Sequence, residues 1–316
     1  MVQKIIIDAD PGIGDALAIG LALKSSEYDV LALTATAGVV SGTQADHNML
    51  AVIERVDPLK HPRLGNASFE QPPETPGNER GRVLLKDLHG ETGLGEIGVR
   101  VPELHHSHPA HKVMIELVHM HQQEITIVTL GPLTNLAIAC DRDPEFSSLV
   151  KRVVCLGGAS MNMGDVTPAA EFNVFSDPEA ARTVLGSPLT LTMIPLEVSR
   201  KPILTLDQFM RLPHQNTAGY RGLLGQLIPF YFRTHHQFMG VEGIPLPEVT
   251  AMAAVLHPEW FETERISVNI ETQGELTRGM TVFDFRGTQR WQGNIDVVRS
   301  LRIQSIVDFF CRSAAE

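Results

Sequence analysis

The sequence predicts an α/β protein with an open, mostly parallel central sheet, Rossmann-like in its core, that carries helices on both faces. Short apolar runs rich in β-branched residues alternate with amphipathic stretches of helical length. The strand-like runs are continuously apolar, which is typical of parallel strands buried on both faces. Of the 316 residues, 43% are hydrophobic, so the chain can bury a large core. No obvious linker interrupts it, and we expect one domain over residues 1–316.

The predicted elements follow one another in strand-and-helix order. We expect strands at residues 4–8, 30–36, 125–130, 152–156 and 189–194, and helices at residues 14–25, 42–56, 132–142 and 177–185. Ligands of such sheets bind beyond the carboxyl ends of the strands. The chain collects polar residues and glycines at the ends of three of these strands: Asp8, Asp10, Asp15, Gly131, Thr134, Asn135, Gly157 and Gly158.

Charge, cysteine content and hydropathy narrow the class of partner. A formal net charge of -11 argues against nucleic acid, which is held mainly by clustered Lys and Arg, and favours a small-molecule ligand. The three cysteines, Cys140, Cys155 and Cys311, lie far apart and predict neither a disulfide framework nor a zinc site. With no apolar stretch long enough to span a bilayer and no leader-like start, we expect a cytoplasmic protein without a membrane partner.

Residues 66–83, NASFEQPPETPGNERGRV, form the most loop-like segment of the chain. They are rich in Pro, Gly and charge, and they lead into the sequence LHGETGLGEIG. A long polar loop in a compact domain is often a lid or a site loop. We therefore expect this segment close to a ligand site.

The first predicted strand ends in an unusual crowd of like charges: Asp8, Asp10 and Asp15 within eight residues. Three carboxylates at one strand end repel one another unless a cation neutralises them, and hard cations prefer oxygen ligands. The cluster therefore indicates calcium or magnesium. Capping of the next helix is the simpler alternative, but one aspartate would suffice for it.

Two other motifs fit this stretch less well. Gly12 and Gly14 begin a G-x-G, yet Leu17 stands where a dinucleotide fingerprint needs its third glycine, and the acids would face a pyrophosphate. A strand that ends in D-x-D also resembles phosphotransferases of the haloacid dehalogenase type, whose aspartate is the nucleophile. Pro11-Gly12 and the lack of a clear second acidic pair make that phosphatase a distant alternative.

Several long blocks together resemble the inosine-uridine preferring nucleoside hydrolase family. The N-terminal signature D-x-D-P-G-x-D-D-A appears here as DADPGIGDA. The other blocks follow in the family's order and cover nearly the whole chain: HGETGLG at 89–95, LGPLTNLA at 130–137, GGASMNMGDVTPAAEFNVFSDPEAA at 157–181 and GIPLPEVTAMAAVLHPEWF at 243–261.

The resemblance implies a calcium-dependent enzyme that cleaves the N-glycosidic bond of a nucleoside with water. Asp10 would bind Ca²⁺ and act as the general base, while Asp15, the main-chain oxygen of Leu130 and Glu248 would complete the metal ligands. Negative charge around the sugar would also favour an oxocarbenium-like transition state. The family likeness further suggests a homodimer or a homotetramer.

The resemblance also assigns a substrate-binding set. Glu171 and Asn173 in AEFN would bond the ribose hydroxyls, and Asp165 and His89 would also contact substrate. Phe172, which lies between the first two, is expected to face either the core or the base. Simple core packing explains Phe172 equally well.

The chain departs from the family pattern at several site positions. Gly14 replaces an acid that would hold a ribose hydroxyl, Val39 and Asp165 stand where Asn is usual, and Pro247-Glu248 stands where the family has His-Asp. Glu248 can still offer a carboxylate to a cation, although a helix N-terminal acid explains it too. With two polar partners lost, we expect weak discrimination between ribosides and 2'-deoxyribosides, and we expect Gly14→Asp to restore it.

Pro247 has no proton to give, which leaves the acid for the departing base unassigned. His89, His235, His236 and Tyr231 are the candidates, the last three within FYFRTHHQF, a predicted helix near the site. The departures also keep two further functions open. One is a relative that acts on another ribose-like or glycosidic substrate, and the other is a metal-stabilised sugar-binding protein without turnover.

Overall fold

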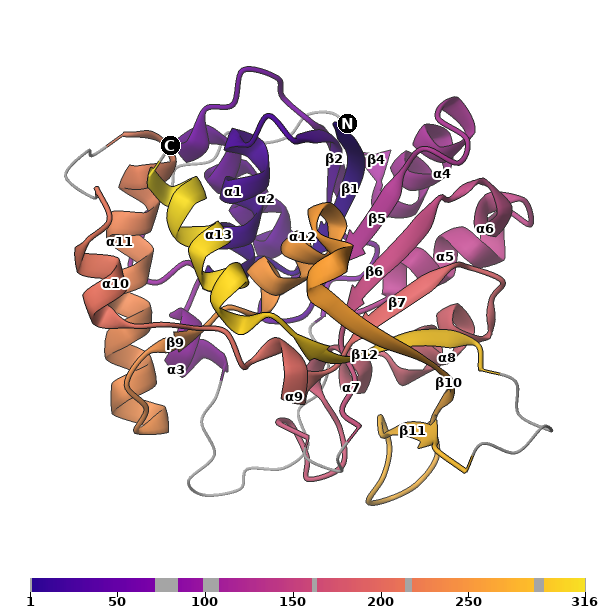
Figure 1. The fold of residues 1–316 in the computed structure, drawn as a ribbon. Coiled ribbons are helices and arrows are strands. Elements are labelled where there is room, and N and C mark those ends of the chain that lie inside the picture. The colour runs from indigo at the N-terminus through magenta and orange to yellow at the C-terminus, as the bar shows by residue number, and fades with distance from the viewer. Residues whose placement is uncertain are drawn as a thin grey trace.

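The computed structural model describes residues 2–71, 85–98, 108–160, 164–213, 218–286 and 293–315. A ten-stranded sheet runs through this part of the chain in the order β11-β10-β12-β7-β6-β5-β1-β2-β3-β4 (Figure 1). The strands from β12 to β4 are parallel, and β10 and β11 add an antiparallel edge. The strands are β1 Gln3–Ala9, β2 Tyr28–Ala35, β3 Arg63–Asn66, β4 His108–Pro109, β5 Thr126–Thr129, β6 Arg152–Leu156, β7 Leu191–Ile194, β10 Phe261–Ile270, β11 Thr281–Asp284 and β12 Ile295–Leu301.

Helices cover both faces of this sheet and bury two apolar cores against it. On β1, Ile5 and Ile7 belong to one core and Ile6 to the other, because successive strand side chains point to opposite faces. One face carries α1 Ile13–Lys24, α2 Gly42–Val56, α11 Gly219–Thr234, α12 Pro247–Leu256 and α13 Ile303–Ala315. The opposite face carries α4 Ala110–Met120, α5 Thr134–Arg142, α6 Phe146–Leu149 and α8 Pro178–Gly186.

Short elements complete the described chain. Figure 1 shows α3, α7 and α9 on the side of the sheet where β1 ends. The short helices are α3 Leu85–His89, α7 Phe172–Ser176, α9 Leu196–Ser199, α10 Leu206–Met210, the π-helix η1 His235–Met239 and the 3₁₀ turn η2 Pro258–Trp260, and β8 Ile203–Leu204 pairs with β9 Ile244–Pro245 in a two-stranded sheet.

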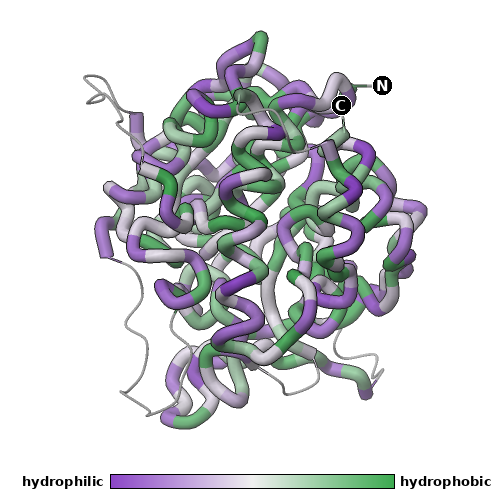
Figure 2. The backbone as a smooth tube through the Cα atoms, turned by 90° about the vertical axis from the view of Figure 1, so that its left-hand side faces the viewer, coloured by the Kyte–Doolittle hydropathy of each residue, from purple (hydrophilic) through white to green (hydrophobic). Residues whose placement is uncertain are grey.

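The predicted α/β fold with a mostly parallel sheet is confirmed. The strand at 152–156 and the helix at 42–56 have the predicted bounds, and the other predicted elements differ by a few residues at their ends. Several helices in Figure 2 alternate between hydrophilic and hydrophobic residues, as the amphipathic pattern requires. The helix predicted at 14–25 is not amphipathic, because α1 is buried over nearly its whole length, and α12 is buried in the same way. The antiparallel edge at β10 and β11 was not expected from the sequence.

The predicted site loop and the expected lack of a membrane span can be compared only with the described residues. Of the predicted site loop at 66–83, residues 72–83 lie outside the described residues. Among the helices that are described, none has the length and apolar character of a membrane span.

Candidate active site

Three acids from two helix starts and one strand end line a single cavity. Asp10 follows β1, Asp15 lies in the first turn of α1, and Glu248 lies in the first turn of α12. Asp10 and Asp15 are 2% and 4% exposed. Burial, followed by the charge of Asp15, raises the pKa of Glu248 to about 8, and burial and the charges of Asp15 and Glu248 raise that of Asp10 well above its usual range. The three carboxylates therefore lie close enough to repel one another.

This carboxylate cluster fits a hard cation. Asp15 Oδ1 is buried and has no hydrogen-bond partner among the described residues, so it is free to bind a ligand. The Leu130 carbonyl, which follows β5, lines the same cavity as the three acids. The structure thus brings together all four predicted metal ligands, each with an oxygen donor of the kind that Ca²⁺ prefers. A divalent ion there would offset a repulsion that is otherwise costly in a buried site.

Backbone amides hold two of these acids in place. The Val39 N–H donates to Asp10 Oδ2 over 2.6 Å, and the Gly12 N–H donates to Asp15 Oδ2 over 2.9 Å. Ideal Cβ atoms on Gly38 and Gly131 would fall 2.0 Å from Asp10 Oδ2 and 2.4 Å from Oδ1. The Asp10 carboxylate therefore sits between two glycines that leave just enough room for it.

Gly14 has the same relationship to Glu248. An ideal Cβ on Gly14 would lie 2.2 Å from Glu248 Oε2, closer than any real contact. The expectation that Gly14 leaves an unfilled place beside Asp15 is wrong, because the Glu248 carboxylate occupies it. An aspartate side chain at position 14 has no room while Glu248 stays there. The expectation that Gly14→Asp alone restores discrimination between ribosides and 2'-deoxyribosides therefore has no structural basis.

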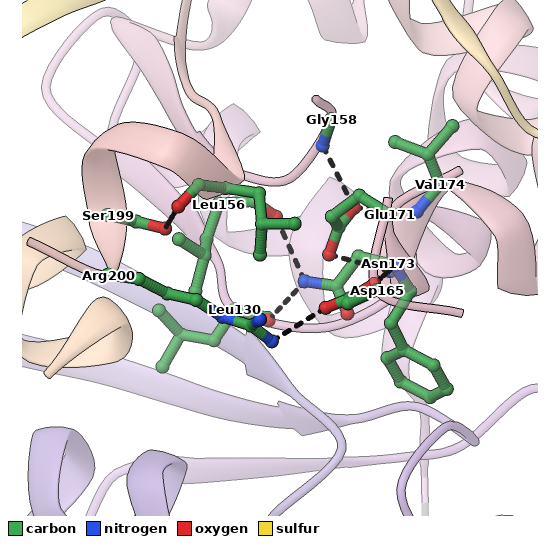
Figure 3. A network of polar contacts seen from close by, with 11 residues as sticks. Leu130, Leu156, Gly158, Asp165, Glu171, Asn173, Val174, Ser199 and Arg200 are labelled. Carbon is green, nitrogen blue, oxygen red and sulfur yellow. Dashed lines mark hydrogen bonds and ion pairs between the residues drawn. The ribbon is translucent and has the colours of Figure 1, made fainter. Parts of the chain in front are cut away.

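Glu171 and Asn173 lie at the start of α7 and form another wall of the cavity (Figure 3). Glu171 caps the helix by accepting from the N–H groups of Asn173 at 2.9 Å and Val174 at 3.2 Å, and it accepts from Gly158 N–H at 2.9 Å. Asn173 Nδ2 donates to the carbonyls of Leu130 at 2.7 Å and Leu156 at 2.9 Å. Burial, followed by the charge of Asp165, raises the pKa of Glu171 to about 7.

Asp165 is held from two sides at this wall. Its Oδ1 accepts from the Phe172 N–H over 2.9 Å, and its Oδ2 accepts from Arg200 Nη2 over 2.7 Å (Figure 3). The predicted substrate residues Asp165 and Phe172 both line the cavity, and Phe172 is 8% exposed. Arg200 was missed by the sequence analysis, since it lies just past α9 in no recognisable motif. Among the described residues that line the cavity, it is the only Lys or Arg.

A cluster of aromatic and imidazole rings also lines the cavity. His89 and Tyr231 have ring centroids 5.4 Å apart, and Tyr231 and His235 meet edge to face at 4.2 Å. His89 Nδ1 accepts from the Ile13 N–H over 3.0 Å, which places the ring proton on Nε2. His235 Nδ1 lies 3.0 Å from the Tyr231 carbonyl, so it carries a proton and donates there. Burial lowers the pKa of both histidines, that of His89 to about 3.

The four candidates for the leaving-group acid separate in space. His89, His235 and Tyr231 line the cavity, whereas His236 is exposed and pairs with Glu242 over 2.9 Å. Burial raises the pKa of Tyr231 far above its usual range, so its hydroxyl is a poor proton donor. The cavity itself measures about 320 Å³, a size suited to a small molecule such as a sugar with one attached ring.

Comparison of this chain with known proteins identifies the family to which it belongs. The model of the family described as inosine-uridine preferring nucleoside hydrolase matches residues 5–308. The chain belongs to this family. It is similar to Uridine nucleosidase 1 of Arabidopsis thaliana, with 36% identity over 294 residues, 92% of this chain and 84% of the relative. It is also similar to the pyrimidine-specific ribonucleoside hydrolase RihA of Salmonella typhi, with 34% identity over 315 residues, 98% of this chain and 97% of the relative.

Solved structures of nucleoside hydrolases share the fold. A plant nucleoside hydrolase, the PpNRh1 enzyme, is 28% identical, with a TM-score of 0.85 over 100% of this chain and 99% of that one. The purine-preferring ribonucleoside hydrolase from Gardnerella vaginalis is 25% identical, with a TM-score of 0.84 over 99% and 98%. The predictions of family and enzyme class are confirmed: the chain is a nucleoside hydrolase.

Proposed function

We propose that this nucleoside hydrolase uses Ca²⁺ and Asp10 to cleave the N-glycosidic bond of ribonucleosides, with uridine and other pyrimidine nucleosides as its substrates. The observation that carries the proposal is the convergence of Asp10, Asp15, Glu248 and the Leu130 carbonyl with Glu171 and Asn173 on one cavity. The pyrimidine preference is supported by the names of the relatives at 34–36% identity.

Different residues of the cavity carry out different parts of the proposed hydrolysis. When bound, Ca²⁺ supplies positive charge that keeps the three acids ionised and makes a nearby water more acidic. Asp10, held by the Val39 N–H, takes the proton of the water that attacks the anomeric carbon. The carboxylates of Glu171 and Glu248 accept hydrogen bonds from sugar hydroxyls and stabilise the positive charge that develops on the ribosyl ring.

The departing base needs a proton, and we assign its delivery to His235. His89 is a poorer candidate because its pKa is lowered to about 3, so the ring is neutral near pH 7, and its Nδ1 is held as an acceptor by the Ile13 N–H. The His235 Nδ1–H instead donates to the Tyr231 carbonyl, a bond that raises the pKa of the ring against the burial that lowers it, and Nε2 is the nitrogen left to donate to the base. Pro247 cannot take this role, since it has no side-chain proton.

A single assay tests the proposal. The purified protein is incubated with Ca²⁺ and with uridine, cytidine or inosine, and free ribose is followed over time. We expect release from the pyrimidine nucleosides, loss of activity with a chelator and recovery with added Ca²⁺. Ribose binding without release of base would instead indicate a sugar-binding protein, and turnover only of other glycosides would indicate a different substrate class. Light scattering of the same sample tests the proposed homodimer or homotetramer.

A further inference from the structure

Gly14 and Glu248 lie 234 positions apart in the sequence but face each other across the helix pair α1 and α12. Each is the second residue of its helix. An ideal Cβ on Gly14 would fall 2.2 Å from Oε2, 2.5 Å from Cδ and 2.7 Å from Oε1 of Glu248. The whole carboxylate group therefore rests against the bare backbone of Gly14, and even a methyl group there would displace it.

The length of the Glu248 side chain matches this placement. An aspartate at 248 would be one methylene shorter, so its carboxylate would stop about 1.5 Å nearer α12. The glutamate carries its charge over Gly14 and next to Asp15, whose Oδ1 is buried without a partner. Two acid groups, Asp15 of α1 and Glu248 of α12, thus lie close together, and the place where α1 could carry a second acid is taken by the Glu248 carboxylate.

We propose that Gly14 and Glu248 act as one unit, in which Glu248 supplies from α12 a metal-binding carboxylate and Gly14 keeps the space that this carboxylate needs. The proposal rests on the proposed function only for the identity of the ion, Ca²⁺. A side chain at 14 is tolerated only if the side chain at 248 becomes shorter. Conversely, an acid returned to position 14 can replace the lost one only in a chain that carries a shorter residue at 248.

The first test is a double-mutant cycle with Gly14→Ala, Glu248→Ala and the double variant. Ca²⁺ affinity is measured by calorimetry and unfolding by circular dichroism with and without Ca²⁺. We expect each single change to weaken Ca²⁺ binding by roughly 10- to 100-fold. In the Glu248→Ala background the methyl group at 14 meets open space, so Gly14→Ala should cause no further loss of affinity and no further fall in Tm.

The second test exchanges the acids between the two helices. Gly14→Asp alone and Glu248→Asp alone should both weaken Ca²⁺ binding, whereas Gly14→Asp/Glu248→Asp should bind at least about tenfold more tightly than either. Gly186→Asp and Glu54→Asp are matched controls: the first adds the same charge where a Cβ meets nothing within 4 Å, and the second shortens an exposed helical glutamate. Both controls should bind Ca²⁺ as the parent does.

The outcomes separate this inference from the proposed function. Three results would each contradict the proposal that Gly14 and Glu248 act as one unit. These are an unchanged Ca²⁺ affinity in Gly14→Ala, mutational effects that simply add in both cycles, and a parent protein that binds no Ca²⁺. If the cycles behave as expected while no nucleoside is cleaved, the unit stands and the proposed hydrolysis falls. Since the Glu248→Asp and Glu248→Ala changes remove atoms and create no clash, they keep the test open even if Gly14→Asp fails to fold.

Discussion

Arg200 Nη2 donates to Asp165 Oδ2 over 2.7 Å, and the other oxygen of Asp165 holds the Phe172 N–H at the start of α7. The residues on either side of Phe172 are Glu171 and Asn173, which face the cavity. Arg200 thus holds the Asp165 carboxylate in place, and Asp165 in turn holds the start of α7. Glu171 and Asn173, which form the proposed sugar-binding wall, lie at this helix start. The charge of Arg200 also acts on Asp165 to lower its pKa against the effect of burial.

Removing this cation should damage substrate binding without unfolding the protein. In Arg200→Ala, Asp165 faces Glu171 with no counter-charge, so the wall should shift and kcat/KM for uridine should fall by roughly 10- to 100-fold. Asp165→Asn removes the repulsion and should restore much of the loss in the double variant. Steady-state kinetics of the four proteins measure this, with Arg302→Ala on the surface as the control. A loss in the double variant equal to that in Arg200→Ala would argue against this role.

Asp10→Asn should abolish proton abstraction while keeping the shape of the site. The amide oxygen can still accept from the Val39 N–H, so we expect a normal circular dichroism spectrum. Loss of a general base should lower kcat by about 10²- to 10⁴-fold. Kinetics are measured at Ca²⁺ concentrations that calorimetry shows to be saturating for the variant. Turnover within tenfold of the parent would exclude Asp10 as the base.

The sequence predicted the parallel part of the fold because each element there carries a local signal. The strand RVVCL at 152–156 is continuously apolar, and the helix at 42–56 begins after Ser41, whose side chain accepts from the Gln44 N–H. The antiparallel edge has a weaker signal. β11 is four residues long, and β10 has a run of exposed residues before its buried end, so neither looks like a strand of the buried centre.

The metal ligands and the sugar-binding wall were predictable through motifs, but their mutual contacts were not. Gly14 read alone suggests a missing acid, and only the packing of α1 against α12 shows that Glu248 fills its place. Arg200 pairs with a residue 35 positions away and sits in no pattern. Such contacts depend on tertiary distances, which neither periodicity nor capping rules encode.

The folded pKa of Glu171, about 7, lies above its ordinary value of 4.5. The folded state therefore binds the proton of the Glu171 carboxyl more tightly than the unfolded state does. The stabilisation that protonated Glu171 contributes to the fold is complete below pH 4.5 and is lost as the pH rises to 7, a change of up to about 3 kcal/mol. Asp165 is the charged group that acts on Glu171, and Arg200 in turn pairs with Asp165. In the presence of a chelator, the stability of Glu171→Gln should fall less steeply over pH 4.5–7 than that of the parent. An equal fall in the free energy of unfolding between pH 4.5 and pH 7 in both proteins would refute this.

His235→Asn should impair only substrates whose leaving group needs a proton. We expect kcat for uridine to fall by about 10²- to 10⁴-fold. A 4-nitrophenyl riboside releases a stable anion, so its hydrolysis should change far less. His236→Asn is the matched control, since His236 is exposed and paired with Glu242. Equal losses on both substrates would mean that His235 positions the ligand rather than protonates the base.

The last prediction concerns the sugar. The described cavity wall is rich in acceptors, because Glu171, Glu248, Asp10 and Asp15 all present carboxylates, while both Nδ2 hydrogens of Asn173 are already donated to carbonyls. Acceptors of this kind need hydroxyl donors, and a 2'-deoxyriboside provides one fewer. Glu248 fills the place at Gly14 that was expected to lack a polar group, so the argument for weak discrimination no longer holds at that position.

We therefore expect a preference for uridine over 2'-deoxyuridine on the order of 10⁴-fold in kcat/KM, the range seen when a site built to bond a hydroxyl meets an analogue without it. Glu248→Gln should reduce that preference, since a neutral amide holds the hydroxyl less strongly than a carboxylate. Kinetics of both proteins on both nucleosides measure the ratio, and Ca²⁺ titration shows whether the metal site is still filled. A parent enzyme that cleaves the two nucleosides within tenfold of each other would show that the carboxylate of Glu248 serves the ion and that of Glu171 serves the helix, rather than the sugar.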